Sequence, residues 1–289
     1  MKNFLCLIVC FGFLVCGTYS LGKDVSSYLQ DISVTIKTKG GEGSGVVFTR
    51  EVFSSTGNKK VNFVWTAAHV LENIRSVRTV LDHEGHSKTI TEFQDVEIVK
   101  KLIENGRTVG QLVMDAKVVK YSDAKDGADL ALLMVRKFSF VEGSAIFYND
   151  KEEKGLALGT QLYHVGSLLG AEGSNSMTTG IMSQVGRTVA LNGGAKVLFD
   201  QTTVTAFPGS SGGGVFLTSG EYVGMLVRGA GETFNLIVPV RRMNKWAKEE
   251  SVLWALDASI PAPSLEDIEK LPIEKMGKVD ETKSVLILP

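Results

Sequence analysis

The chain has 289 residues, of which 31 are basic and 32 acidic, so its formal net charge is −1. Hydrophobic residues make up 44% and charged residues 22%, which is typical of a folded soluble protein and excludes wholesale disorder, collagen and a multi-span membrane protein. The chain also lacks the basic excess of nucleic-acid-binding proteins, so we expect no nucleic-acid partner.

Residues 1–20 have the pattern of a signal peptide. A lysine at position 2 precedes the apolar run Phe4–Gly17, and Thr18-Tyr19-Ser20 follows it, with small residues near the cleavage site. Cleavage after Ser20 or after Gly17 predicts an exported protein, either periplasmic or secreted. Two alternatives remain: the same run serves as an uncleaved membrane anchor, or Cys16 carries a lipid.

The three cysteines, Cys6, Cys10 and Cys16, all lie in this N-terminal segment. A mature chain that starts near Leu21 would therefore contain no cysteine. Disulfides, thiol catalysis and cysteine-based metal sites are not expected.

From Ile32 onward, short β-branched runs alternate with Gly, Asn, Asp and Ser, which predicts many short strands. Asn105-Gly106 between two alternating runs predicts a hairpin. The density of short strands favours antiparallel barrels or a sandwich over a βαβ fold. The predicted strands are Ile32–Lys37, Gly45–Thr49, Asn62–Thr66, Val77–Leu81, Val96–Ile103, Arg107–Val113, Lys117–Val119, Leu130–Val135, Gln161–Val165, Gly180–Val185, Lys196–Thr202, Gly214–Leu217, Glu221–Val227 and Phe234–Val238.

The hydrophobic period becomes helical near the C-terminus, which predicts one helix at about 240–256. Arg241 and Arg242 are interpreted as its solvated face. Residues 258–289 are polar and of mixed charge, apart from an apolar end, and we expect a tail with weak structure. Its apolar end is expected to pack on the body, the alternative being a regulatory peptide that occupies a groove.

Three segments carry residues suited to nucleophilic catalysis: an apolar strand that leads to His69, Asp129 at the start of a buried run, and Ser211 within a glycine-dense turn. A serine hydroxyl needs an adjacent base, and an imidazole meets that need. A buried carboxylate would fix the imidazole tautomer. Glycines beside Ser211 let the N–H groups of Gly209 and Ser211 face an oxyanion.

These segments resemble the trypsin-like serine peptidases of the chymotrypsin fold, and most closely the HtrA/Deg-type peptidase domain. The similar motifs are Gly43-Ser44-Gly45-Val46-Val47-Phe48, Thr66-Ala67-Ala68-His69-Val70, Asp129-Leu130-Ala131-Leu132-Leu133 and Pro208-Gly209-Ser210-Ser211-Gly212-Gly213. The resemblance covers about residues 30–245. It implies an all-β fold of two antiparallel six-stranded barrels with a C-terminal helix, and an active site between them.

Together with the signal peptide at 1–20, the resemblance predicts a peptidase domain (21–257, with the boundary between barrels near 140–160) followed by a tail (258–289). Within the family, His69 would be the general base, Asp129 its orienting partner and Ser211 the nucleophile, with no cofactor. No PDZ domain is expected after the peptidase domain, and an inserted hairpin is expected around residues 83–113. The loop 167–173 is similar to one that gates the oxyanion hole.

The family analogy places Thr205 at the base of the pocket for the residue before the cleaved bond, with Leu226, Val227 and Arg228 along its wall. Since no aspartate occupies that base, we expect a small or medium apolar residue there. His83, Glu84 and His86 lack the zinc-peptidase spacing and are interpreted as a surface loop, so no metal is expected. His164 is interpreted as structural.

The sequence therefore predicts an exported serine endopeptidase that acts on proteins or peptides through an acyl-enzyme intermediate. No membrane contact is expected beyond a possible N-terminal anchor, and no oligomeric state is predicted. Two alternatives remain: a binding or scaffolding protein that keeps the peptidase fold with little or no turnover, and a viral or phage processing peptidase.

Overall fold

The computed structural model describes residues 24–274 except 82, 84, 127, 150–152, 191–195 and 230–232. The predicted signal peptide, the three cysteines, Glu84 and the apolar C-terminal end lie outside the described residues. Within those residues, no helix is long and hydrophobic enough to span a bilayer.

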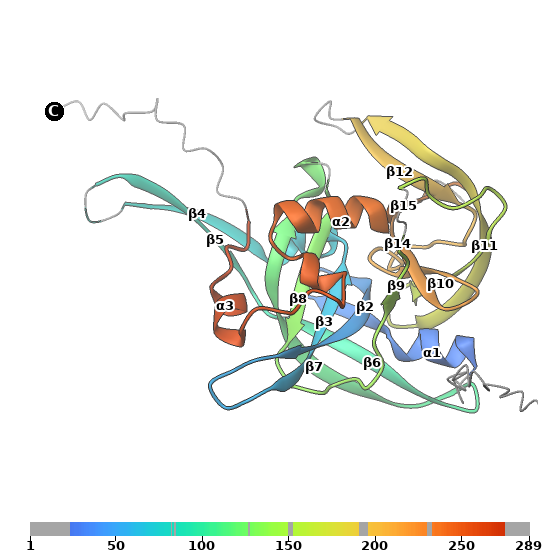
Figure 1. The fold of residues 1–289 in the computed structure, drawn as a ribbon, viewed down its shortest axis with the longest axis horizontal. Coiled ribbons are helices and arrows are strands. Elements are labelled where there is room, and N and C mark those ends of the chain that lie inside the picture. Colours follow the sequence, from blue (N-terminus) through green and yellow to red (C-terminus); the bar gives the residue numbers. More distant parts are fainter. Residues whose placement is uncertain are drawn as a thin grey trace, which may run out of the picture.

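The N-terminal half forms a closed six-stranded antiparallel barrel, coloured blue to green in Figure 1. Pairing of β1 with β6, with Thr35 opposite Val99, completes the ring. In the order of the sheet, its strands are β1 (Ser33–Thr38), β2 (Gly41–Val52), β3 (Lys59–Thr66), β8 (Leu130–Val135), β7 (Arg107–Ser122) and β6 (Val96–Glu104).

Strand β8 is buried along its whole length and joins two hydrophobic cores. Because successive side chains point to opposite faces of a strand, Leu130, Leu132 and Met134 enter the core shared with the second half of the chain, whereas Ala131, Leu133 and Val135 fill the barrel. Both faces of β8, the strand that directly follows Asp129, are therefore packed in a hydrophobic core.

The C-terminal half forms a seven-stranded sheet. The prediction of two six-stranded barrels is thus confirmed for the first barrel, and the second unit is assigned as a sheet in which β13 also pairs with β14. In order, its strands are β13 (Gly214–Leu217), β10 (Gln161–Leu168), β11 (Gly173–Ala190), β12 (Lys196–Thr202), β15 (Asn235–Pro239), β14 (Glu221–Gly229) and β9 (Ile146–Phe147).

Helix α2 (Val240–Glu249) lies across the two halves, as Figure 1 shows. Its Trp246 packs edge-on against Trp65 of β3, with ring centroids 5.9 Å apart. The predicted helix at 240–256 ends earlier than expected, since a separate 3₁₀ turn, η3 (Leu253–Ala255), follows. Two further 3₁₀ turns are η1 (Ala68–Ile74) and η2 (Ala124–Asp126).

The structure corrects the expected hairpin insertion. Strand β4 (Arg75–Leu81) pairs with β5 (Ser87–Phe93) in a separate two-stranded ribbon, which projects from the barrel in Figure 1. The predicted Asn-Gly hairpin joins β6 to β7, two adjacent strands of the barrel. Both turn residues have positive φ (51° and 74°), as a type I′ turn requires.

The prediction of weak structure after residue 258 is wrong for residues 258–274. Helix α3 (Leu265–Lys270) buries Ile268, and Ser264 caps it by accepting a hydrogen bond from the Asp267 N–H. The N–H of Tyr121 donates to the carbonyl of Ile273, which ties the segment to β7. The N-terminal helix α1 (Val25–Asp31) was also not predicted.

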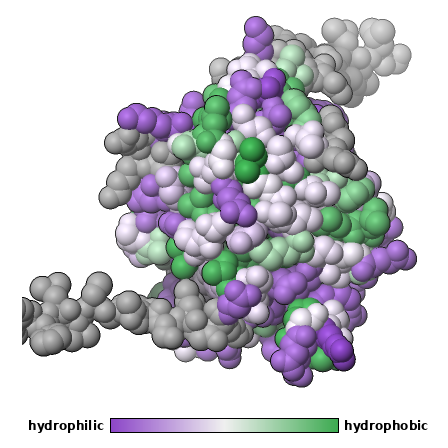
Figure 2. Space-filling view, turned by 90° about the vertical axis from the view of Figure 1, so that its right-hand side faces the viewer, coloured by the Kyte–Doolittle hydropathy of each residue, from purple (hydrophilic) through white to green (hydrophobic). Residues whose placement is uncertain are grey.

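Apolar residues on the side of the molecule that Figure 2 shows form small patches separated by hydrophilic residues. The largest fully buried side chains include Trp65, Tyr222, Phe48 and Phe63. These four aromatic side chains all belong to the core that the two halves share.

Candidate active site

His69 and Asp129 are 60 residues apart in the chain and lie in direct contact. The Nδ1 atom of His69 is 2.9 Å from Oδ2 and 3.0 Å from Oδ1 of Asp129. The backbone N–H of His69 donates to the same Oδ1 at 3.0 Å. Because a carboxylate oxygen accepts hydrogen bonds, this contact favours the neutral imidazole tautomer with the proton on Nδ1, in which Nε2 is the acceptor.

Strand pairing brings these two residues together. Thr66 at the end of β3 lies opposite Ala131 near the start of β8. The segment after Thr66, which carries His69, and the segment before Ala131, which carries Asp129, therefore leave the barrel at the same edge. Asp129 is 2% exposed and has a φ of +53°, an uncommon conformation for a non-glycine residue. The barrel thus holds a buried carboxylate against a half-exposed imidazole.

Ser211 lies in the turn that precedes β13, and this turn packs against the segment that leads to His69. Gly209 and Gly212 have φ values of +94° and +88°, which favour glycine. A Cβ at Gly212 would lie 2.1 Å from the Ser44 carbonyl oxygen and 3.0 Å from the Ala67 nitrogen, so only glycine permits this approach.

The structure does not bond all three residues to one another. Among the described residues, the Ser211 hydroxyl makes no hydrogen bond to His69, although Ser211 is half-buried beside the same barrel edge. Also within the described part of the chain, the N–H groups of Gly209 and Ser211 donate to no protein acceptor. These two N–H groups remain available to a ligand.

The loop 167–171 contacts the Ser211 turn directly. The Leu169 N–H donates to the Pro208 carbonyl at 2.8 Å, and the Ala171 N–H donates to the Glu42 carboxylate at 2.5 Å. Gly170 has a φ of +72°, and a Cβ there would lie 2.1 Å from a Glu42 oxygen. Loop and turn therefore form one connected unit, anchored on β2.

His164 lies in β10, fully buried behind the Ser211 turn. Its Nδ1 is 2.9 Å from the Gly214 carbonyl oxygen, whereas its Nε2 has no hydrogen-bond partner among the described residues. Burial lowers the pKa of His164 to about 4, so the ring is neutral near pH 7. A Cβ at Gly213 would lie 2.6 Å from this ring.

The four predicted pocket residues have unequal exposure. Leu226 and Val227 are buried in the cores at 2% and 3% exposure, Thr205 is half-buried, and Arg228 is exposed. Arg228 lines a cavity of about 330 Å³ together with Gly229, Phe234 and Leu236. Of the four, Arg228 is the residue whose side chain faces open space.

The interpretation of Arg241 and Arg242 as a solvated helix face is wrong. Arg241 forms a two-pronged ion pair with buried Asp200. Arg242 lies over the Phe199 ring at 4.7 Å and donates to the backbone beside Asp129. Burial lowers the pKa of Arg242 to about 10, and the negative charge of Asp129 partly opposes this shift. Sequence periodicity identified the helix but not which cations turn inward.

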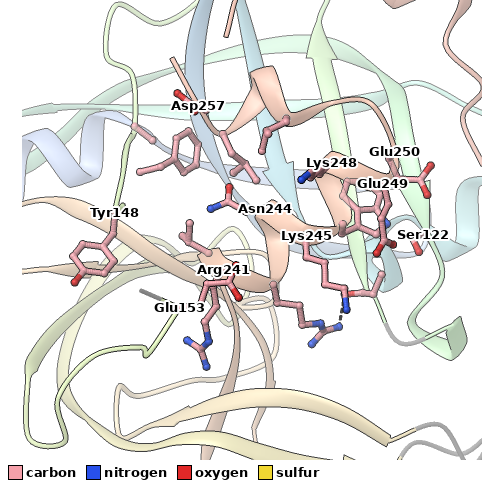
Figure 3. A pocket seen from close by; sticks show the side chains of 18 of the residues that line it. Ser122, Tyr148, Glu153, Arg241, Asn244, Lys245, Lys248, Glu249, Glu250 and Asp257 are labelled. Carbon is pink, nitrogen blue, oxygen red and sulfur yellow. Dashed lines mark hydrogen bonds between the residues drawn. The ribbon is translucent and has the colours of Figure 1, made fainter. Parts of the chain in front are cut away.

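A larger cavity, of about 1650 Å³, runs along α2, and neither His69 nor Ser211 lines it. Figure 3 shows that its labelled side chains are mostly charged or polar, with Arg241 and Lys245 from α2 among them. Its walls carry side chains of both charges, among them Lys245 and Glu249. His83 and His86 are exposed, and the described residues include no group of three or more metal-ligating side chains.

Comparison with known proteins places these features in context. The family model of the trypsin-like peptidase domain matches residues 43–225. The serine protease Do-like HtrA of Lactobacillus helveticus is 34% identical over 130 residues, which cover 45% of this chain and 28% of that protein. The protein of the same description from Bacillus subtilis (strain 168) is 26% identical over 194 residues, covering 65% of this chain and 33% of the relative. The chain thus aligns with a third or less of the length of these relatives.

Solved structures share the fold. The Rv3671c protease of M. tuberculosis H37Rv in an inactive form has a TM-score of 0.55 at 16% identity, covering 79% of this chain and 93% of that one. The crystal structure of Deg5 has a TM-score of 0.54 at 18% identity, covering 80% and 93% respectively.

Proposed function

Because this chain belongs to the family of trypsin-like peptidase domains, we propose that it is a serine endopeptidase that hydrolyses peptide bonds through an acyl-enzyme intermediate. The observation that carries the proposal is the contact between the Asp129 carboxylate and both Nδ1 and the backbone N–H of His69. In the neutral ring this contact favours the tautomer with the proton on Nδ1, which leaves Nε2 to act as the general base.

In the proposed reaction, the Ser211 hydroxyl oxygen attacks the carbonyl carbon of the substrate while its proton passes to Nε2 of His69. The oxyanion that forms accepts hydrogen bonds from the N–H groups of Gly209 and Ser211. The imidazolium then gives its proton to the leaving amine, and the C–N bond breaks. Water, deprotonated by His69, releases the acyl group and restores the serine.

Protein or peptide substrates follow from this chemistry, and we retain a small or medium apolar residue before the cleaved bond as the proposed preference. The neutral, half-buried Thr205 supports this preference. We further propose that the second sheet acts as the second barrel of the fold, for which the β13–β14 pairing is the support, and that the chain is exported through its N-terminal segment.

A second function is a peptide-binding protein with little or no turnover. The observation in its favour is that the Ser211 hydroxyl and His69 are not hydrogen-bonded among the described residues. Catalytic hydrogen bonds often tighten only when substrate binds, so this observation does not outweigh the ordered His69–Asp129 pair.

The test is labelling of purified protein with a fluorophosphonate probe across pH 6–9, with mass mapping of the adduct. We expect the adduct on Ser211, loss of labelling in Ser211→Ala, and strong reduction in Asp129→Asn. Ser219→Ala, at an exposed position that bonds only to Glu221 among the described residues, is the control serine. A folded protein that acquires no adduct would favour the binding role.

A further inference from the structure

One buried serine of the first barrel binds the Ser211 turn at two points. Ser44, on β2, is fully buried. Its N–H donates to the Ser211 carbonyl at 2.7 Å, and its Oγ–H donates to the Gly209 carbonyl, also at 2.7 Å. Ser44 of the first half therefore holds the Ser211 turn of the second half by two hydrogen bonds.

Every carbonyl group from Pro208 to Ser211 has a partner. Besides the two bonds to Ser44, the Pro208 carbonyl accepts from Leu169 N–H at 2.8 Å, and the Ser210 carbonyl accepts from Gly213 N–H at 3.0 Å. In a trans peptide the C=O and the following N–H point in opposite directions. The Gly209 N–H shares its peptide group with the Pro208 carbonyl, and the Ser211 N–H shares its peptide group with the Ser210 carbonyl. Each of these N–H groups therefore points away from the partner of that carbonyl, Leu169 or Gly213.

The Ser44 hydroxyl also supports the neighbouring loop. While it donates to Gly209, it accepts a hydrogen bond from the Ser167 N–H at 2.7 Å. The Ser167 hydroxyl in turn lies 2.6 Å from that of Thr35 on β1. Leu169, two residues further along this loop, holds the Pro208 carbonyl. Both peptide groups that flank Gly209 thus depend on Ser44, one directly and one through the loop.

We propose that Ser44 is the positioning residue of the oxyanion hole. The inference rests on the proposed peptidase function. Without the hydroxyl, the half-buried Gly209 carbonyl and the N–H of buried Ser167 lose their shared partner, and unpaired polar groups away from water are costly. The observed conformation of the turn is then less stable relative to a rotated one. Rotation of the Pro208–Gly209 peptide would replace the Gly209 N–H in the oxyanion hole by the Pro208 carbonyl oxygen.

The kinetic test compares Ser44→Ala with Ser33→Ala. Ser33 is a matched control because it is also buried on the first barrel, and its Oγ donates to the Leu29 carbonyl at 2.8 Å, away from the site. We expect Ser44→Ala to lower kcat about 100-fold, as loss of one oxyanion donor does, with KM within about twofold. Ser33→Ala should retain the wild-type kcat. A wild-type kcat in Ser44→Ala, or an equal loss in both variants, would overturn the proposal.

A second measurement needs no turnover and so separates this inference from the proposed function. In protein labelled with ¹⁵N-glycine, the amide signals of Gly209 and Gly212 should shift or broaden in Ser44→Ala and remain in place in Ser33→Ala. Unchanged signals would refute the role of Ser44. Changed signals in a protein whose wild type shows neither turnover nor fluorophosphonate labelling would refute the peptidase function alone.

Discussion

Nη2 of Arg242 donates a hydrogen bond of 2.9 Å to the carbonyl of Ala128, the residue that precedes Asp129. This bond crosses from α2 of the second half to the edge of the first barrel. Since Asp129 adopts a left-handed conformation, which is costly for a non-glycine residue, a fixed partner for the preceding carbonyl helps to keep the carboxylate directed at His69.

Replacement of Arg242 should therefore impair activity more than it impairs folding. We expect Arg242→Met to lower kcat at least tenfold, because small misplacement of a reacting group has large effects on rate. Arg242→Lys should recover only part of the loss, because lysine lacks the planar fork that stacks on Phe199 and reaches Ala128. Steady-state kinetics with Lys245→Met, an exposed position on the same helix, as control would measure this. Equal kcat values for Arg242→Met and the control would contradict the prediction.

His164 should make stability fall as the pH falls. Its pKa is about 4 in the folded protein because burial disfavours the charged ring, against roughly 6.5 when unfolded. Between these values the unfolded chain binds a proton that the folded chain does not. The free energy of unfolding should therefore decline from about pH 6.5 down to about pH 4, by up to ~1.4 kcal/mol per pH unit, and His164 should contribute no slope above that window.

Urea unfolding of wild type and His164→Asn at several pH values would isolate this contribution. Asparagine can still donate to the Gly214 carbonyl but does not titrate. The free energy of unfolding of wild type minus that of His164→Asn should decrease as the pH falls from about 6.5 to about 4. Parallel curves would show that the histidine does not control acid stability.

Lys120 of β7 and Glu250, just beyond α2, form an ion pair of 3.0 Å with side chains only 4% and 7% exposed. Lys120→Met leaves a buried carboxylate without this cation, and we expect a loss of about 3 kcal/mol in the free energy of unfolding. The exposed pair Lys125–Glu72, at 3.4 Å, provides the comparison. Lys125→Met should cost less than about 1 kcal/mol by urea unfolding. Similar losses of unfolding free energy in Lys120→Met and Lys125→Met would show that burial does not determine how much an ion pair contributes to stability.

Helix α3 should contribute to the stability of the whole domain. Ile268 is 1% exposed and belongs to the core that both halves share. Ile268→Ala should lower the free energy of unfolding by about 2–4 kcal/mol, since it removes buried methylenes and leaves a cavity. Lys270→Ala, an exposed position in the same helix, should have little effect. A thermal scan in which both variants match wild type would show that α3 does not form part of the folded unit.

Local patterns in the sequence account for much of this fold. Alternating β-branched runs identified most strands, and Asn105-Gly106 identified its hairpin, because turn chemistry and strand alternation are read from neighbouring residues. Several short elements were not predicted. Strand β9 has two residues, strand β5 is mostly polar and pairs with β4, α1 lacks a side-chain cap, and α3 has only six residues.

The sequence by itself determined the family resemblance and the chemical types of His69, Asp129 and Ser211, since short motifs carry both. Only the tertiary structure decided which groups support them. The bond from Arg242 to Ala128 and the clamp of Ser44 on Gly209 each join positions more than 100 residues apart. No local pattern encodes such partners, because they arise when β2, α2 and the Ser211 turn pack together and their buried polar groups require hydrogen bonds.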